Sequence, residues 1–261
     1  MCLILFSYNE HPDYPLVVAA NRDEFYGRPT APAAFWDDAP HVLAGRDLEA
    51  GGTWMGVTRS GWWAAVTNYR DPSRRKEDAP SRGRLVADYL RQEAAPKAYL
   101  DQLVPQADRY NGFNLLVGTP DALAYYSNRD GAVRMLGPGL YGLSNHLLDT
   151  GWPKVERGRK KLRRVLESGE VTADRLLDLL HDTTVPADEK LPDTGIGKAG
   201  ERLLSPMFIE SERYGTRSST VFIVDRAGRA AFAERVYDRN APPETRRFAF
   251  EIASVSTDAD R

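Results

Sequence analysis

One residue of this chain could supply both a nucleophile and a base. Cys2, the only cysteine, directly follows the initiator methionine. Methionine is normally removed before a small residue, which would leave the thiol and a free α-amine on the same residue. The unperturbed pKa of such an amine is about 7.7–8.0 and that of a thiol about 8.5, so the amine could accept the thiol proton at physiological pH. The alternative is that Cys2 is a small apolar residue in a buried strand.

A run of four polar residues, Asn21, Arg22, Asp23 and Glu24, follows the second apolar segment of the chain. A hairpin between the first two apolar segments would bring this run close to Cys2. There, Asp23 could accept a hydrogen bond from the ammonium group or the thiol. Arg22 could lower the thiol pKa or bind a substrate carboxylate. The alternative is an ordinary turn, in which Asn and Asp are common.

The elements that must position these residues are strands at both ends of the chain and helices in the middle. Helical periodicity predicts helices at residues 81–93, with Ser81 as the N-cap, and at 97–103, 154–168 and 172–181. Two segments, 70–84 and 182–200, are predicted to be mobile loops. Short apolar runs between turn residues predict strands at 3–7, 16–20, 52–58, 61–67, 114–118, 122–127, 133–136, 140–143, 220–224 and 230–236.

The composition excludes several classes of protein. Of the 261 residues, 42% are hydrophobic and 28% are charged, and the net charge is -2, which is typical of a globular protein. No linker rich in Pro, Gly or Ser divides the sequence, so we predict a single domain over residues 1–261. Basic and acidic residues are balanced along the chain, so no nucleic-acid partner is expected. Nothing in the sequence indicates an oligomeric state.

Location and metal binding are predicted by what the sequence lacks. No stretch approaches the roughly 20 apolar residues of a transmembrane helix, and the opening MCLILF has no basic region typical of a signal peptide. We therefore expect a cytoplasmic protein without a membrane span. The histidines, His11, His41, His146 and His181, show no metal-ligand spacing, so neither a metal site nor a required cofactor is predicted.

A series of motifs resembles the NRDE-motif family, also known as the transport and Golgi organisation family. The motifs occur in the order MCLILF, NRDEF, AGRDLEAGGTWMGV, TNYRDP, SRGRLV, GLSN and YGTRSSTV, and they extend over nearly the whole chain. That family is in turn distantly similar to the cysteine N-terminal-nucleophile hydrolases, such as choloylglycine hydrolases and penicillin acylases. The resemblance implies an α+β fold, a four-layer αββα sandwich with antiparallel sheets.

The resemblance also implies roles for particular residues. In those hydrolases the nucleophile is the cysteine after the initiator, which here is Cys2. Asn21 and Asp23 fit an Asn-x-Asp element at the end of the next strand. Two further asparagines that supply oxyanion or positioning contacts correspond to Asn68 and Asn145.

Arginine is the residue type at which this chain departs from the hydrolase pattern. The hydrolases carry an arginine just before the Asn-x-Asp element, but here that position is Ala20 and the arginine lies inside the element as Arg22. A guanidinium displaced in this way could bind an acidic ligand instead of activating the thiol. Arg217 could match a late arginine of the hydrolase site.

Besides a structural or interaction protein with no small-molecule site, two functions stay open. The first is a hydrolase that cleaves an amide or acyl bond of a small amphiphilic substrate, with Cys2, Asp23, Asn68 and Asn145 as catalytic residues. The second is a non-catalytic protein of the same fold that binds or transfers haem, acyl-coenzyme A or a lipid, as the family resemblance implies. In the second case His146 is a candidate haem ligand, although a plain loop histidine is the simpler interpretation.

Overall fold

The first strand shows why this chain forms layers. The structure, a computed structural model, describes residues 2–252. Every residue of β1 (Cys2–Tyr8) is buried, so both faces of its sheet are covered. Side chains of a strand alternate between the two faces. Ile4 and Phe6 accordingly lie in a core between two sheets, whereas Leu3 and Leu5 pack in a second core beneath helices.

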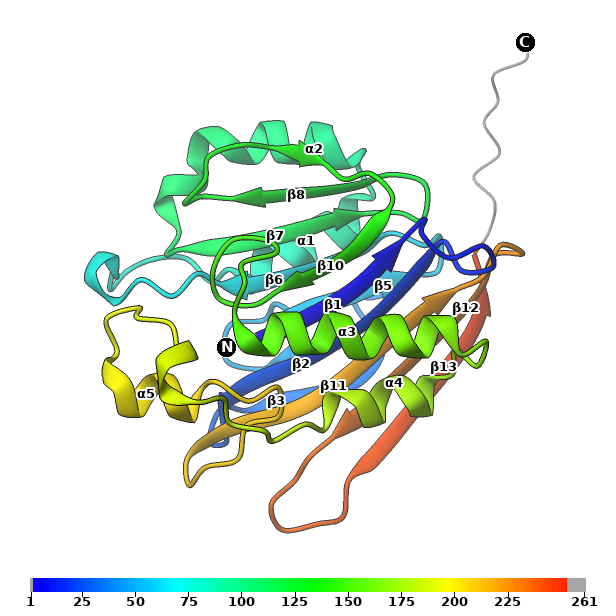
Figure 1. Cartoon of the computed structure of the whole chain (residues 1–261). Helices are drawn as coiled ribbons and strands as arrows, with labels where there is room; N and C mark the ends of the chain where they lie inside the picture. The colour runs from blue at the N-terminus through cyan, green and yellow to red at the C-terminus, as the bar shows by residue number, and fades with distance from the viewer. Residues whose placement is uncertain (1, 253–261) are drawn as a thin grey trace.

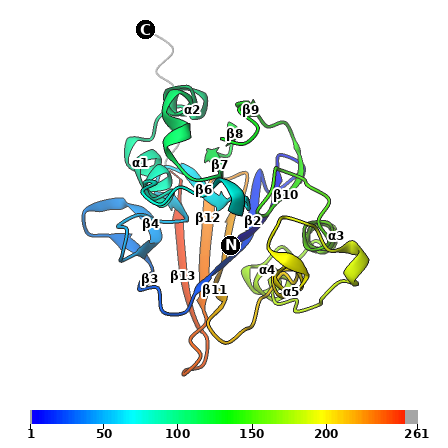
Figure 2. The ribbon, with the colours of Figure 1, turned by 90° about the vertical axis from the view of Figure 1, so that its left-hand side faces the viewer.

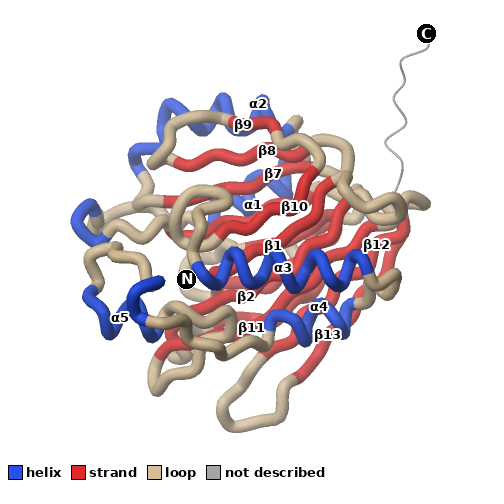
Figure 3. Tube along the Cα trace, in the orientation of Figure 1, coloured by secondary structure: helices blue, strands red, loops and turns tan. Residues whose placement is uncertain are grey.

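Two antiparallel sheets pack face to face (Figures 1 and 3). The first has the order β10-β1-β2-β11-β12-β13 and the second the order β3-β4-β5-β6-β7-β8-β9. The remaining strands of the first sheet are β2 (Leu16–Phe25), β10 (Gly139–Leu143), β11 (Tyr214–Val224), β12 (Arg229–Val236) and β13 (Glu244–Glu251). The strands of the second sheet are β3 (Thr30–Trp36), β4 (Ala39–Asp47), β5 (Met55–Thr58), β6 (Trp63–Asn68), β7 (Phe113–Gly118), β8 (Leu123–Ser127) and β9 (Arg134–Met135).

Helices cover the outer face of each sheet (Figure 2). The second sheet is covered by α1 (Gly83–Gln92) and α2 (Pro96–Leu103), and the first by α3 (Pro153–Glu167) and α4 (Ala173–Leu180). Shorter helices are α5 (Gly197–Leu203) and the 3-10 turns Pro72–Arg74, Val104–Arg109 and Asp188–Lys190. The predicted αββα sandwich with antiparallel sheets is therefore confirmed. Among the described residues, no helix is long and apolar enough to cross a membrane.

Large apolar side chains fill most of the space between the sheets. Phe6, Trp63, Tyr125 and Phe222 are all fully buried in this core. The ring of Phe6 stacks on Tyr141 with centroids 5.0 Å apart and lies 6.1 Å from the ring of Trp63. These contacts hold the two sheets together, since burying each large side chain contributes roughly 1.5–3 kcal/mol.

The sequence predicts that the second strand ends before the polar run at residues 21–24. In the structure the strand continues through this run. β2 continues through Asn21, Arg22, Asp23 and Glu24 to Phe25. The reason is that β2 is a central strand, paired with β1 on one side and with β11 on the other. Ladder hydrogen bonds on both sides keep the polar residues extended.

The first long helix begins later than predicted. The structure places Arg82, not Ser81, at the N-cap of α1, and no side chain caps the helix. The backbone N–H of Arg84 donates to the carbonyl oxygen of Ser81 at 3.2 Å, so the main chain and not the hydroxyl of Ser81 takes part in the first turn. The two predicted loops, 70–84 and 182–200, each contain a 3-10 turn, and the second also contains the start of α5.

Candidate active site

Strand register places three polar side chains in one row at the end of the first sheet. Cys2 of β1 pairs with Arg22 of β2, and Arg22 pairs with Ser218 of β11. Directly paired residues point to the same face of a sheet. Ile4, which points to the same face of β1 as Cys2, lies in the core between the two sheets. The row therefore faces the second sheet.

A cavity of about 380 Å³ opens beside this row, between the ends of the two sheets. Its size falls within the roughly 300–1,000 Å³ of pockets that bind small molecules. The first sheet contributes Cys2, Arg22, Asp23, Glu24, Ser218 and Glu234 to the lining, and the second sheet contributes Thr30, Gly45, Arg46, Asp47, Val66 and Asn68. Loops contribute Arg28, Glu49, Ala50, Thr53, Trp54, Asn111 and residues 79–83.

Two glycines bring together two turns that border the cavity. A Cβ atom on Gly52 would lie 2.5 Å from the backbone carbon of Gly83, so only glycine fits there. The backbone N–H of Thr53 donates to the carbonyl oxygen of Gly83 at 3.1 Å. This contact between two turns positions Arg82, which lines the cavity and donates from Nη1 to the carbonyl oxygen of Gly112 at 3.1 Å.

Cys2 lines the cavity, although only 8% of the residue is exposed. Burial raises the pKa of the Cys2 thiol, the negative charge of Asp23 raises it further, and Arg22 acts in the opposite direction. Ser144 holds the main chain at this point, because its Oγ donates to the carbonyl oxygen of Cys2 at 3.0 Å. The thiol is therefore protonated at neutral pH and needs a base to become a nucleophile.

Asp23 is fixed by residues of β11. The Oγ1 of Thr216 donates to Oδ1 of Asp23 at 2.7 Å, and the hydroxyl of Tyr214 donates to the carbonyl oxygen of Asp23 at 2.9 Å. Burial raises the pKa of the Asp23 carboxyl, whereas Lys154 and the hydrogen bond from Thr216 lower it. This carboxyl is thus held rigidly beside the start of β1, where it could orient an α-amine on Cys2.

Arg22 is a buried cation whose hydrogen bonding is incomplete. Its side chain is 8% exposed, and its Nη2 lies 4.0 Å from Oε2 of Glu24. Within residues 2–252, Nη1 of Arg22 has no hydrogen-bond partner. Leaving a buried charged donor without a partner is costly. The arrangement suits an anionic group of a ligand in the cavity.

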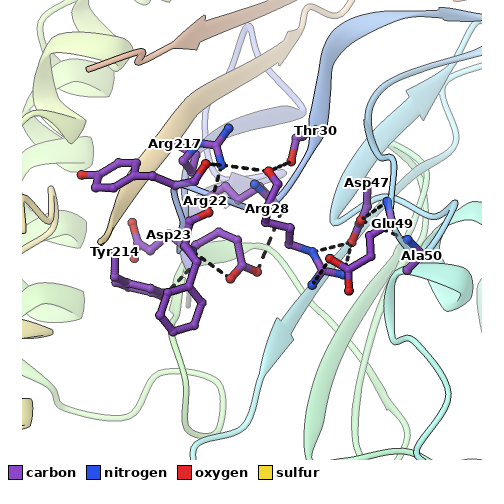
Figure 4. A network of polar contacts seen from close by, with 12 residues as sticks. Arg22, Asp23, Arg28, Thr30, Asp47, Glu49, Ala50, Tyr214 and Arg217 are labelled. Carbon is purple, nitrogen blue, oxygen red and sulfur yellow. Dashed lines mark hydrogen bonds and ion pairs between the residues drawn. The ribbon is translucent and has the colours of Figure 1, made fainter. Parts of the chain in front are cut away.

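A second arginine that lines the cavity is fully engaged (Figure 4). Arg28 donates from Nε and Nη2 to Oδ2 of Asp47 at 3.0 and 2.8 Å, and its Nη1 lies 3.3 Å from Oε2 of Glu49. The carboxylate of Asp47 also accepts from the backbone N–H groups of Glu49 and Ala50. Because Arg28 is already paired, Arg22 is the better candidate for binding an anion.

The two predicted oxyanion asparagines are adjacent, but only one borders the cavity. Asn68, at the end of β6, lines it. Asn145 is fully buried behind it, and its Nδ2 donates to the carbonyl oxygen of Asn68 at 2.9 Å. The backbone N–H of Arg70 donates to the carbonyl oxygen of Asn145 at 2.7 Å. The geometry thus offers Asn68 as a contact for substrate and Asn145 as the residue that fixes Asn68.

Two other predicted site residues lie away from the cavity. Asn21 is fully buried on the helix-facing side of β2, and its Nδ2 donates to the carbonyl oxygens of Leu180 and Met207 at 3.1 and 2.8 Å. Its Oδ1 accepts from Oγ of Ser219 at 2.6 Å. These bonds tie the segments around α4 to the sheet, so the geometry gives Asn21 a structural setting.

Arg217 occupies an irregularity of β11. The pairing with β2 shifts between Thr216 and Ser218, so Arg217 is the extra residue of a bulge. Its Nη1 donates to the carbonyl oxygens of Phe25, Tyr26 and Arg28 at 3.0, 3.0 and 3.1 Å (Figure 4). Arg217 therefore holds the turn after β2, and it is not among the residues that line the cavity.

His146 has both ring nitrogens engaged. Its Nε2 lies 2.8 Å from the hydroxyl of Tyr69, and its Nδ1 lies 2.9 Å from Oγ1 of Thr150. An iron atom would have to displace one of these partners. No group of three or more His, Cys, Asp or Glu side chains that could hold a metal ion occurs in the described part of the chain.

Several residues around the cavity were not predicted from the sequence. Ser144 and Thr216 lie inside motifs that the family resemblance rests on, GLSN and YGTRSSTV, so those motifs were a usable signal. No sequence signal pointed to Glu234, because it follows a run of apolar and small residues in an ordinary hairpin strand. Its carboxylate accepts from the backbone N–H of Ala33 at 2.6 Å, and burial raises its pKa.

Comparisons with known proteins agree with this architecture. The sequence profile described as Transport and Golgi organisation 2 matches residues 1–239. The chain is 35% identical over 281 residues to the mouse (Mus musculus) Transport and Golgi organization 2 homolog, covering 97% of this chain and 100% of that protein. It is 30% identical over 263 residues to the Drosophila melanogaster Transport and Golgi organization protein 2, covering 90% and 91%.

A solved structure shares the fold at very low sequence identity. A mutant of the conjugated bile acid hydrolase from Clostridium perfringens superposes with a TM-score of 0.52 at 8% identity, over 97% of this chain and 92% of that one. The fold described here is therefore that of the N-terminal-nucleophile hydrolases.

Proposed function

We propose that this chain, which belongs to the Transport and Golgi organisation 2 family, is a cysteine hydrolase that cleaves an amide or acyl bond of a small amphiphilic substrate. The observation that carries the proposal is the position of Cys2. Cys2 lines a cavity of about 380 Å³ that Asp23, Asn68 and the buried guanidinium of Arg22 also line. Nucleophile, amide donor and cation thus border one space, and the carboxylate of Asp23 lies on the other face of β2, held by Thr216.

The reaction begins with an α-amine on Cys2, which requires removal of Met1, a residue outside the described part of the chain. The amine accepts the thiol proton, and the thiolate forms a C–S bond to the substrate carbonyl carbon. Asn68 donates to the oxyanion. The C–N, C–O or C–S bond to the leaving group then breaks, and the leaving group takes the proton from the ammonium. Water, deprotonated by the same amine, cleaves the thioester and restores the thiol.

Burial of the thiol explains why the amine is needed. Since burial raises the pKa of Cys2, little thiolate exists at neutral pH without a base in contact with it. Asp23, held by Thr216 and Tyr214, can keep such an amine in place. Arg22 would bind the acidic part of the substrate and offset the negative charge that develops in the cavity.

The test compares wild-type protein with Cys2→Ala and Cys2→Ser against a panel of N-acyl amino acids and acyl thioesters. Intact mass first establishes that Met1 is absent from each sample. We expect hydrolysis to fall by at least a factor of about 1,000 in Cys2→Ala, as with other lost nucleophiles, while the melting temperature stays close to that of wild type. A Cys2→Ala protein that hydrolyses every wild-type substrate at the wild-type rate would refute the proposal.

A second function, binding or transfer of haem, acyl-coenzyme A or a related lipid, is favoured by one observation. Nη1 of Arg22 has no hydrogen-bond partner within residues 2–252, although it is buried beside the cavity. Each of these ligands carries carboxylate or phosphate groups that a guanidinium binds well. If binding is the function, calorimetry and absorbance will show micromolar affinity that Arg22→Met abolishes and Cys2→Ala preserves. Absence of binding by the wild-type protein argues against this second function.

A further inference from the structure

Lys154 occupies a position that stability alone does not favour. It is 2% exposed, in the first turn of α3, and its Nζ donates to the carbonyl oxygen of Leu204 at 2.9 Å. Burying an ammonium group is costly, and the N-terminal turn of a helix carries partial positive charge that repels a cation. A residue that is unfavourable on both counts requires an explanation from its surroundings.

Lys154 lies behind the cavity, on the helix-covered face of the first sheet. α3 packs directly against β1, the strand that begins with Cys2 (Figure 1). On β2, Arg22 faces the inner space, so the next residue, Asp23, points to the face that α3 covers. The charge of Lys154 is felt by Asp23 and by Cys2, and burial lowers the pKa of Lys154 to about 8 although both of these groups oppose the change.

The other charged groups around Lys154 largely cancel one another. Arg70 and Glu201 form a buried ion pair with 2.6 Å between Nη1 and Oε2. Nη1 of the same Arg70 is thus committed to Glu201, whose Oε1 also accepts from Oγ1 of Thr194 at 2.5 Å. This pair carries no net charge, although Arg70 also interacts electrostatically with Asp23, so Lys154 supplies the unbalanced positive charge beside Asp23 and the start of β1.

We infer that Lys154 is a positioning residue of the proposed hydrolase, whose buried ammonium keeps Asp23 ionised and favours the deprotonated forms of the Cys2 thiol and α-amine. The inference rests on the proposed function, since it concerns the same nucleophile. A positive charge next to the amine lowers the fraction of ammonium, which makes the amine a base at neutral pH, and it stabilises the thiolate that the amine creates. The other charged or titratable groups that act on Cys2 are Arg22, Arg82 and Tyr214.

The test measures the rate of Cys2 alkylation by iodoacetamide from pH 5 to 10, using full-length protein from which Met1 has been removed. Lys154→Gln keeps a donor for the carbonyl oxygen of Leu204 but removes the charge, Lys154→Arg keeps the charge, and Lys160→Met is an exposed control on the same helix. Because Lys154 is protonated below about pH 8, we expect Lys154→Gln to lower the alkylation rate at pH 7 about tenfold and to have little effect above about pH 9. Lys154→Arg and Lys160→Met should keep the wild-type rate at pH 7.

The outcomes separate this inference from the proposed function. If Lys154 only anchors α3 to Leu204, Lys154→Gln will keep the wild-type pH profile, which overturns the inference and leaves the hydrolase proposal standing. If wild-type Cys2 titrates as an ordinary free thiol and no substrate is cleaved, both are overturned. Should Lys154→Gln fail to fold, Lys154→Met removes the charge without burying an unpaired polar group and gives the same comparison.

Discussion

The space between the two sheets differs between its middle and its end. In the middle, one row across the first sheet consists of Phe6, Val18, Phe222 and Phe232, all buried. Four residues further along the same strands, the row consists of Cys2, Arg22, Ser218 and the partly buried Val236. About 13 Å of strand thus separates a fully packed core from a polar cavity.

The difference shows how one architecture accommodates both stability and chemistry. The alternation of side chains is unchanged between the two rows, so the backbone presents both in the same way. Only the residue types differ: aromatic rings fill the middle, whereas small and charged side chains at the end leave room for a ligand. The middle should therefore determine the free energy of unfolding, and the end should determine binding and reactivity.

The largest expected effect concerns the packed middle. Phe222→Ala should lower the free energy of unfolding by about 3–5 kcal/mol, because it removes a fully buried ring and leaves a cavity. Phe25→Ala is the matched control, since Phe25 is 60% exposed on the adjacent strand and its loss should cost less than about 1 kcal/mol. Urea unfolding measures both. Equal losses would show that the middle does not carry the stability.

An intermediate effect concerns Arg22 at the open end. Arg22→Met should change the free energy of unfolding by less than about 1 kcal/mol, or increase it, because a buried cation with incomplete hydrogen bonding is replaced by an apolar side chain of similar length. Arg22→Met also removes the positive charge that opposes the effect of burial on Cys2. The pKa of the Cys2 thiol should therefore rise. The exposed Arg84→Met is the control. Destabilisation as large as that of Phe222→Ala would contradict the comparison.

The smallest effect concerns Glu234, one step inward from the cavity row. Because burial raises its pKa, the folded state holds the proton more tightly than the unfolded state. Stability from this group is therefore present at low pH and is lost as pH rises from about 4.5 through the folded pKa. Glu234→Gln should remove this loss, so that its melting temperature falls less than that of wild type between pH 4 and 7. Glu251→Gln, at the exposed end of β13, should behave as wild type; an identical pH dependence of all three proteins would disprove the assignment.

Much of the fold could be predicted because its local signals are strong. The hairpin of β1 and β2 follows from two apolar runs around a turn, and it correctly brings Arg22 opposite Cys2. The hairpin of β11 and β12 turns at Gly228, where φ is +79°, as the sequence Asp-Arg-Ala-Gly indicated. Three strands were missed: β3, β4 and β13. β4 lies inside the second sheet, whereas β3 and β13 each form an edge of their sheet. Edge strands tolerate proline and charged residues. β3 contains a proline and β13 contains charged residues, so neither strand shows a clear apolar pattern.

The site was less predictable because it depends on contacts between distant segments. That β2 continues through its polar run follows from pairing with β11, about 190 residues later in the chain. The bulge that turns Arg217 toward the carbonyl oxygen of Phe25 depends on a shift in that pairing, which no residue type announces. Likewise, Asn21, Arg22 and Asp23 look equivalent in the sequence. Because side chains of a strand alternate, Asn21 and Asp23 lie on one face of β2 and Arg22 lies on the other.

The backbone contact between Gly52 and Gly83 has a consequence for how new specificities can arise. Where two main chains meet directly, no rotamer change can separate the two turns, and any larger residue would push them apart. Variation in the size of the ligand must therefore come from side chains that line the cavity, such as Trp54 and Ala79. An engineer who wishes to admit a bulkier molecule should vary those side chains first and leave the glycines unchanged.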